Sequence, residues 1–234
     1  MNFEVVALPR KVWRWGASRA DYWIMESKIC YALGMARPRT FDEASVLDAA
    51  AREFRVHGYA ETSTEQLCEA AGVRRSSLYN AFVSKDELFV RALERYVETT
   101  GARQAAILAD DALPGAERLR ALIDVVVGEE LQASSHGHGA GCMVVQSFMS
   151  PDLRARDDRV ARILDRDLRE RLSLLSGAIR AGRVDGSIAE GIDPDDGAVL
   201  VSTVISGLRV TAQTGIGTEA LRRIALAGLS SLLN

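Results

Sequence analysis

The sequence predicts an all-α protein, with an N-terminal three-helix helix-turn-helix domain followed by a helical C-terminal domain. The 234 residues include only five prolines and few aromatic residues, a composition that favours helices over strands. Apolar residues recur three and four positions apart, as in Leu47, Ala50 and Phe54, which places them on one face of a helix. Helix start signals stand between such segments, for example Ser84 followed three positions later by Glu87.

The totals exclude several classes of protein. The formal net charge of −3 is too small to suggest bulk coating of nucleic acid or binding to an anionic membrane. Cys30, Cys68 and Cys142 are odd in number and widely spaced, which favours neither a disulfide framework nor a zinc site and predicts a reducing, cytoplasmic location. No run of eighteen apolar residues occurs, so we expect no membrane partner. No phosphate loop, nucleophile elbow or zinc hydrolase motif appears, so we expect no enzyme and no cofactor.

The segment 63–88 predicts two short helices joined by a tight turn. Ser63 and Gln66 form a capping box at the first helix, and Gly72 supplies a residue that tolerates positive φ at its end. The second helix buries Leu78 and Phe82 on one thin stripe and leaves a polar, cationic outer face. This arrangement is typical of a helix-turn-helix whose second helix enters the major groove of DNA.

A longer pattern at fixed spacing surrounds this segment. Its residues are Leu47, Ala50, Phe54, Gly58, Tyr59, Thr62, Ser63, Ala70, Ala71, Gly72, Val73, Leu78, Tyr79, Phe82, Lys85, Leu88 and Phe89. On these residues the chain resembles the DNA-binding domain of the tetracycline-repressor (TetR) family of bacterial transcriptional regulators. The resemblance implies a DNA-binding transcriptional regulator, a homodimeric repressor that a small-molecule effector releases from a near-palindromic operator.

The N-terminal residues 1–34 stand apart from this pattern, because all three tryptophans lie there and charges interrupt any apolar stretch. We expect either a start codon assigned too far upstream, a poorly ordered extension, or an added arm that touches DNA or packs on the body. Arg37 and Arg39 follow, on either side of Pro38. They are either a basic arm that reaches the minor groove or phosphates, or a solvated terminus.

The rest of the chain divides into a DNA-binding domain over 35–100 and an effector-binding and dimerisation domain over 101–234. A helix that begins after Ser84 and runs to about residue 105 links the two, with Tyr96 on its apolar stripe.

Polar side chains of the second short helix are the candidates for base recognition. Arg74 and Arg75 suit phosphate or guanine edges, and Asn80 suits adenine. Ser76 and Ser77 suit either kind of contact.

The resemblance adds phosphate contacts at Tyr79 and Lys85, with Thr62 and Thr64 at the first helix as further candidates. One position departs from the family. Arg74 stands where the family often has a serine that caps the recognition helix, so we expect the cap to be lost and a cation gained.

The C-terminal domain shows helical patterns over 116–133, 142–149, 151–182, 194–214 and 218–233. The last two are more apolar than one buried face requires, and a monomer would expose the remainder. We therefore expect a homodimer in which each chain gives these two helices to a four-helix bundle; the alternative is a core within one chain.

The resemblance implies an effector pocket among the first four of these helices. Six residues are proposed to line this pocket, and each of them could instead be an ordinary core residue. They are Leu122, Val126, Met143, Ser147, Phe148 and Met149.

Cys142 has two interpretations. It is a small core residue, or it is the reactive thiol of an electrophile-sensing or redox-sensing regulator, which would require a lowered thiol pKa. His136 and His138 precede it, but the set lacks a fourth ligand, and we expect no metal site.

Overall fold

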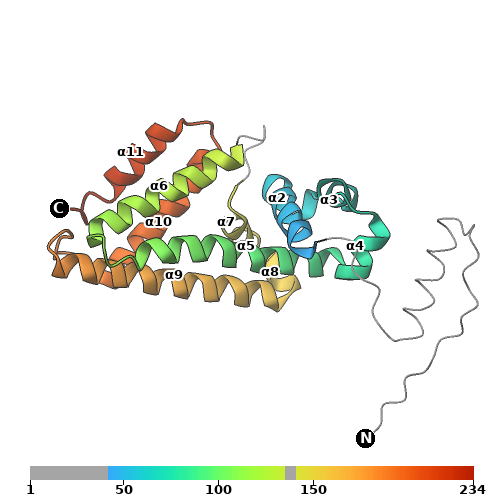
Figure 1. The fold of residues 1–234 in the computed structure, drawn as a ribbon, viewed down its shortest axis with the longest axis horizontal. Helices are drawn as coiled ribbons and strands as arrows, with labels where there is room; N and C mark the ends of the chain where they lie inside the picture. The colour runs from blue at the N-terminus through green and yellow to red at the C-terminus, as the bar shows by residue number, and fades with distance from the viewer. Residues whose placement is uncertain (1–41, 135–140) are drawn as a thin grey trace, which may run out of the picture. The chain divides into compact units, whose positions relative to one another are not determined.

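The computed structural model describes residues 42–134 and 141–234, and the expected extension, Arg37, Arg39, His136 and His138 lie outside these ranges. Within them the regular secondary structure is helical, apart from one isolated bridge between Ile188 and Leu233, so the prediction of an all-α fold is confirmed. No helix of this described part has both the length and the apolar character needed to span a membrane. In chain order the helices (Figure 1) are α2 Glu43–Glu61, α3 Thr64–Ala71, α4 Arg75–Phe82, α5 Lys85–Leu108, α6 Gly115–Ser134, α7 Met143–Phe148, α8 Pro151–Arg156, α9 Asp158–Val184, α10 Pro194–Ala212 and α11 Thr218–Gly228.

A head is formed by α2, α3, α4 and the start of α5. The Phe54 ring of α2 meets the Phe89 ring of α5 edge to face, with centroids 5.0 Å apart, and Tyr59 meets Phe89 in the same way at 5.1 Å. Leu67 of α3 and Phe82 of α4 are each only 1% exposed. Aromatic edge-to-face pairs add to the burial of their area, so these rings fix α2 against the long helix that leaves the head.

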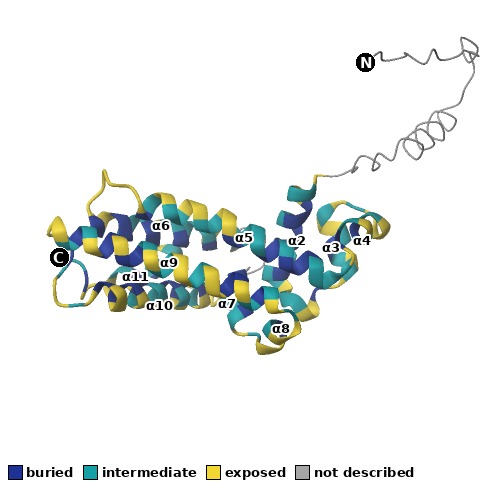
Figure 2. Cartoon of the chain, turned by 90° about the horizontal axis from the view of Figure 1, so that it is seen from below, coloured by how far each residue is buried: buried dark blue, intermediate teal, exposed yellow. Residues whose placement is uncertain are grey.

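A helical body is formed by the rest of α5 with α6, α9, α10 and α11. Leu119, Leu175, Val201 and Leu229 are completely buried and belong to one core. Figure 2 shows buried positions between these helices and exposed positions on their outer faces. Because α5 runs through both head and body, the predicted boundary between residues 100 and 101 falls inside a continuous helix.

The base of the body is closed by direct contact between α6 and α9. A Cβ atom added to Gly115 would overlap the Cα of Gly182, so the two backbones touch. The first amides of α6 are satisfied there as well. Gly115 N donates to Asp185 Oδ2 at 2.9 Å, and Ala116 N donates to Ser187 Oγ at 3.0 Å. Side-chain acceptors at a helix start replace the hydrogen bonds that its first turn lacks.

Two predicted helices have different bounds. The single helix expected over 151–182 is wrong, because Asp157 is extended and separates α8 from α9. Its carboxylate accepts from Arg159 N at 2.9 Å, which makes Asp157 the N-cap of α9. The last helix ends at Gly228 instead of 233, and Ala189 N then donates to Leu232 O at 2.9 Å.

Candidate DNA interface and internal cavity

The first short helix of the head begins and ends as the sequence predicts. Ser63 Oγ accepts from Gln66 N at 3.2 Å, and Ser63 N donates to Gln66 Oε1 at 2.8 Å. Gly72 adopts the left-handed conformation, with φ 63°. The capping box and the glycine turn are therefore confirmed, and they set the angle at which α4 leaves α3.

The second short helix, α4, presents a polar outer face. Arg74 is its N-cap residue and, among the described residues, its side chain finds no capping partner, as expected from the missing serine. Leu78 and Phe82 are the two buried residues of α4. The side chains left exposed or half-buried on the other faces are Arg74, Arg75, Ser76, Ser77, Tyr79 and Asn80.

Tyr79 connects the two short helices. Its hydroxyl lies 3.2 Å from Thr64 Oγ1, within hydrogen-bond distance. The Arg75 guanidinium lies over the Tyr79 ring at 5.7 Å and donates to Glu65 Oε1 at 3.0 Å. The Arg75–Glu65 pair is exposed, and exposed ion pairs contribute little free energy, so Arg75 is available to another acceptor.

Lys85 and Thr62 lie close in the chain to the same corner but differ in burial. The Lys85 ammonium lies 4.5 Å from the centroid of the Tyr59 ring and donates to Ala60 O at 3.4 Å. Thr62 is 1% exposed, and its hydroxyl donates to Gly58 O at 2.5 Å. The burial of Thr62 is unfavourable to a phosphate contact through its side chain, whereas Thr64 and Lys85 are accessible.

A cavity of about 470 Å³ lies in the body, bounded by α5, α7, α9 and α10. Its volume is within the range that holds a small-molecule ligand. The lining combines apolar with charged side chains: Tyr96, Val97, Glu98, Thr100, Gly101, Ala102, Gln104, Ala105, Leu108, Cys142, Val144, Arg166, Asp167, Glu170, Arg171, Leu174 and Arg209.

None of the six residues predicted to line an effector pocket borders this cavity. Leu122 and Val126 are in the body core, at 1% and 0% exposed. Met143 and Ser147 are buried, and the Ser147 hydroxyl donates to Met143 O at 2.7 Å. Phe148, not among the buried residues, also stays outside the lining, and Met149 is 79% exposed. The residues that line the cavity are therefore different from those that the sequence suggested for an effector pocket.

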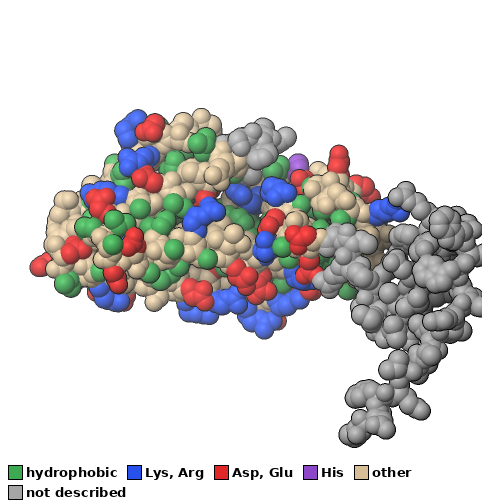
Figure 3. Space-filling model, in the orientation of Figure 1, with side chains coloured by type: hydrophobic (Ala, Val, Ile, Leu, Met, Phe, Trp, Pro, Cys, Tyr) green, Lys and Arg blue, Asp and Glu red, His purple; other side chains and the backbone are tan. Residues whose placement is uncertain are grey.

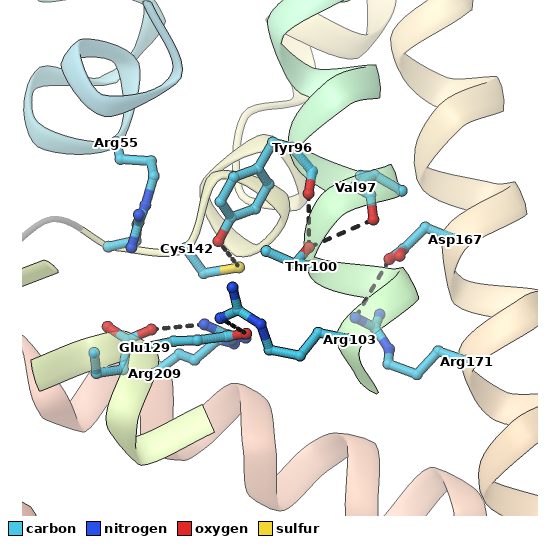
Figure 4. Close-up of polar contacts among 12 residues, drawn as sticks. Arg55, Tyr96, Val97, Thr100, Arg103, Glu129, Cys142, Asp167, Arg171 and Arg209 are labelled. Carbon is cyan, nitrogen blue, oxygen red and sulfur yellow. Dashed lines mark hydrogen bonds and ion pairs between the residues drawn. The ribbon is translucent and has the colours of Figure 1, made fainter. Parts of the chain in front are cut away.

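One wall of the cavity holds Tyr96 and Cys142, which Figure 4 shows side by side. The Tyr96 hydroxyl donates to Cys142 Sγ at 3.7 Å. Burial, followed by the proximity of Cys142, raises the pKa of Tyr96 far above its usual value, so the phenol stays protonated and remains a donor.

Arg209 forms the floor of the cavity and is held by two carboxylates of α6. Its guanidinium donates to Glu129 Oε2 at 2.7 Å (Figure 4). It also donates to Glu130 Oε1 at 2.7 Å. Arg209 is 6% exposed and Glu130 is 4% exposed. Burial raises the pKa of Glu130 while Arg209 lowers it. Buried ions of this kind depend on their partners, since removing one leaves the others uncompensated.

The α9 wall contains buried hydrogen-bonding capacity that the described residues leave unused. Asp167 Oδ2 forms an ion pair with Arg171 Nη1 at 3.3 Å that lacks the geometry of a hydrogen bond. Asp167 Oδ2 and Arg171 Nε are both buried without a hydrogen-bond partner in this part of the chain. Burial raises the pKa of Asp167. Buried polar atoms without partners are uncommon in proteins, so this wall is suited to a polar ligand group.

The helix α7 connects the cavity to the head. Cys142 and Val144, at its start, line the cavity. In the same turn, Arg55 Nε of α2 donates to Gly141 O at 2.8 Å, and Gln146 Nε2 donates back to Arg55 O at 2.7 Å. The Arg55 guanidinium also lies 5.3 Å from the centroid of the Tyr96 ring. A change in the cavity that moves α7 therefore acts directly on α2.

Comparison with known proteins agrees with this architecture. Residues 46–92 match the model of a family described as bacterial regulatory proteins, tetR family. A cysteine mutant of the TetR family transcriptional regulator CifR, solved with 26-base-pair operator DNA, is 32% identical, covering 82% of this chain and 98% of that one with a TM-score of 0.68.

Two curated repressors of Escherichia coli (strain K12) are also similar. The HTH-type transcriptional repressor ComR is 28% identical over 209 residues, which cover 86% of this chain and 93% of ComR. The HTH-type transcriptional repressor BdcR is 36% identical over 121 residues, covering 52% of this chain and 59% of BdcR.

Proposed function

This chain belongs to the tetR family of bacterial regulatory proteins, and we propose that it is a homodimeric repressor that a small-molecule effector releases from a near-palindromic operator. Its general role, as a DNA-binding transcriptional regulator, follows from the family. The repressor assignment is supported by the names of ComR and BdcR. We place the protein in the cytoplasm, with its operator.

The observation that carries the proposal is the path from cavity to head through α7. Cys142 borders the cavity, and its neighbour Gly141 accepts the hydrogen bond from Arg55 of α2. A ligand that fits the cavity better in one position of α7 shifts the population toward that position. Typical coupling energies of about 1–3 kcal/mol correspond to roughly 5- to 150-fold in operator affinity.

The dimer is supported by apolar side chains that the single chain leaves in solvent. Val199 and Val210 of α10 are 52% and 57% exposed, and Ile224 of α11 is 60% exposed. Gly207 and Gly228 are exposed as well, which permits close helix contact. We propose that the segments 194–214 and 218–233 form the interface, and that two copies place their α4 helices about 34–36 Å apart on DNA.

The DNA contacts that we propose come from one face of the head, within a domain over 35–100 that precedes the effector-binding and dimerisation domain over 101–234. Thr62 is left out because it is buried. The remaining candidates are Thr64, Arg74, Arg75, Ser76, Ser77, Tyr79, Asn80 and Lys85.

The deciding experiment is selection of duplexes from a random library by the purified protein at about 0.15 M salt. Enrichment of a near-palindromic site by a dimer supports the proposal. If a well-folded dimer enriches nothing, the selection is repeated with protein refolded free of small molecules. A second failure contradicts the proposal.

Single substitutions then separate the two kinds of DNA contact. Lys85→Ala should weaken binding to all sequences alike and lower the salt dependence, since it removes a phosphate contact. Arg75→Ala and Asn80→Ala should relax preference at particular base pairs. A uniform loss for the last two would remove them as base-reading residues.

A second candidate function rests on Cys142, which is buried, borders the cavity and accepts a hydrogen bond from Tyr96. An electrophile small enough to enter the cavity would meet this thiol, and the adduct would displace α7. The test is operator binding after treatment with an electrophile, for the wild type and for Cys142→Ser. An unchanged response in Cys142→Ser excludes the thiol mechanism.

A further inference from the structure

The last turn of α8 brings an arginine of the body to the DNA-binding head. The Arg156 guanidinium lies 5.6 Å from the centroid of the Tyr59 ring, the same ring over which the Lys85 ammonium lies at 4.5 Å. Tyr59 lies in the last turn of α2, which ends at Glu61, and Lys85 begins α5. Figure 3 shows Lys and Arg side chains gathered over α8 and the adjoining part of α9, with acidic side chains among them.

Neither cation has a carboxylate partner in the described part of the chain. Lys85 donates to the carbonyl of Ala60, and Arg156 is exposed and contacts the face of Tyr59. The neighbouring carboxylate of Asp86 accepts the Tyr59 hydroxyl. The arginine that follows in the chain differs, since Arg159 is paired with both Glu87 and Asp157.

The two cations affect each other electrostatically. Burial lowers the pKa of Lys85, Arg156 lowers it further, and Asp86 and Glu61 oppose the shift. Like charges repel, and an anion that contacts both converts the repulsion into two attractions. A guanidinium also matches the geometry of a phosphate, to which it donates two parallel hydrogen bonds.

We propose that Arg156 binds a backbone phosphate of the operator beside the one contacted by Lys85, so that the DNA interface extends beyond the helix-turn-helix into α8. This rests on the proposed role of Lys85 at a phosphate. Both charges lie over the Tyr59 ring, at 4.5 Å and 5.6 Å from its centroid, which suits them to the same stretch of backbone. Because α8 follows α7 within three residues, the segment that borders the cavity also carries a DNA contact.

The experiment measures operator affinity by fluorescence anisotropy from about 0.1 to 0.4 M salt. Arg156→Gln keeps much of the side-chain stem over Tyr59 and removes the charge. Lys85→Gln is the positive control. Arg162→Gln is the matched negative control, because Arg162 is also an exposed arginine and its Nε donates only to Asp158 O at 3.4 Å.

Loss of one phosphate contact per protomer should make the slope of log affinity against log salt shallower by about 1.8 for the dimer. When the salt concentration rises four-fold, both proteins lose operator affinity. The fold-loss of the Arg156→Gln dimer should be about 12 times smaller than that of the wild type. Lys85→Gln should give a similar change, Arg162→Gln none, and Arg156→Lys should keep most of the wild-type slope.

Two results would overturn the inference. An Arg156→Gln slope equal to that of the wild type means that Arg156 only packs on Tyr59, even if affinity falls. An equal change in slope for Arg162→Gln means that no particular contact is made. If Lys85→Gln alters the slope and Arg156→Gln does not, only this inference fails; if the wild type selects no operator, the proposed function fails.

Discussion

The two ends of α9 are built in different ways. Near its C-terminal end, Gly182 meets the backbone of Gly115, and Leu175 and Ile179 are completely buried. In its N-terminal half, Asp167 and Arg171 face the cavity with buried polar atoms that have no hydrogen-bond partner among the described residues. The first end is close-packed and apolar, and the second is polar and borders a hollow.

This difference indicates that one end of α9 stabilises the fold and the other responds to a ligand. A close-packed contact has one arrangement, since any shift opens a void or an overlap. A buried polar network that is only partly satisfied is held less firmly, and a ligand that supplies the missing partners stabilises one arrangement of it. We therefore expect substitutions at the base to change the free energy of unfolding, and substitutions around the cavity and α7 to change DNA binding as well.

The largest effect is expected for Arg209→Ala. The substitution leaves Glu129 and Glu130 buried without their common partner, which should lower the free energy of unfolding by about 3–5 kcal/mol. Chemical denaturation at fixed protein concentration measures it. The matched control is Arg222→Ala, because Arg222 pairs with Asp124 at the surface and should lose less than about 1 kcal/mol. If both variants lose the same small amount of unfolding free energy, the assignment of Arg209 to a buried ionic cluster is contradicted.

The Arg209→Ala defect should also depend on pH. Burial already raises the pKa of Glu130, and Arg209 opposes this rise. Without Arg209 the folded pKa moves further above that of the unfolded chain, so protonation favours the folded state. The loss should therefore be smallest at low pH and grow as the pH rises through the folded pKa. A loss independent of pH would contradict the assignment.

The next effect tests the base of the body. Gly115→Ala should lower the free energy of unfolding by about 1–3 kcal/mol, because its Cβ would overlap the backbone of Gly182. Gly128→Ala in the same helix is the control. No atom lies within 4 Å of a Cβ added there, so helix propensity should raise stability by about 0.5–1 kcal/mol. Thermal unfolding of both variants measures the two changes in stability. Changes of the same sign in both variants would refute the close contact between Gly115 and Gly182.

A smaller effect is expected at the connection to the head. Gln146→Ala removes the hydrogen bond to Arg55 O, which should cost about 0.5–1.5 kcal/mol and change operator affinity. Ser150→Ala is the control, since its hydroxyl donates only to Gln146 O. Calorimetry and anisotropy together distinguish the two. Identical operator affinities for both variants would show that α7 does not act on the head.

The smallest effect is expected in the turn between α4 and α5. Val83 has φ 59° and is 79% exposed, a strained conformation for a β-branched residue. Val83→Gly should raise the free energy of unfolding by about 1 kcal/mol. Val73→Gly is the control. Val73 is a half-buried valine without positive φ, since Val83 is the only non-glycine residue with positive φ in the described chain. Destabilisation by both variants would argue against strain at Val83.

Features fixed by neighbours in the chain could be predicted from the sequence. The capping box of Ser63 and Gln66 and the left-handed Gly72 depend on residues within one or two turns. The break at Asp157 was missed because Arg156-Asp157-Asp158 also suits the surface of a continuous helix. The extended conformation accompanies the N-cap role of Asp157 and the packing of α8 against α7 and α9.

The cavity could not be predicted because its residues meet across the chain. Arg209 is the one charge of α10 beyond its acidic first turn, which signals a buried partner, but Glu129 and Glu130 lie about eighty positions away in sequence. Tyr96 fits the apolar stripe of its helix, and nothing local indicates that its hydroxyl meets Cys142. The pair of Asp167 and Arg171 has the spacing of an ordinary surface ion pair.

The length of α9 has a mechanical consequence. From Gly182, fixed at the base, to Arg159, paired with Glu87 at 2.8 Å, the helix measures about 35 Å. A helix pivoting at one end behaves as a lever, and a tilt of about 3° would move the far end by about 2 Å over this length. That displacement is enough to break the Arg159–Glu87 hydrogen bond, so a slight rotation at the base would cost the head this contact.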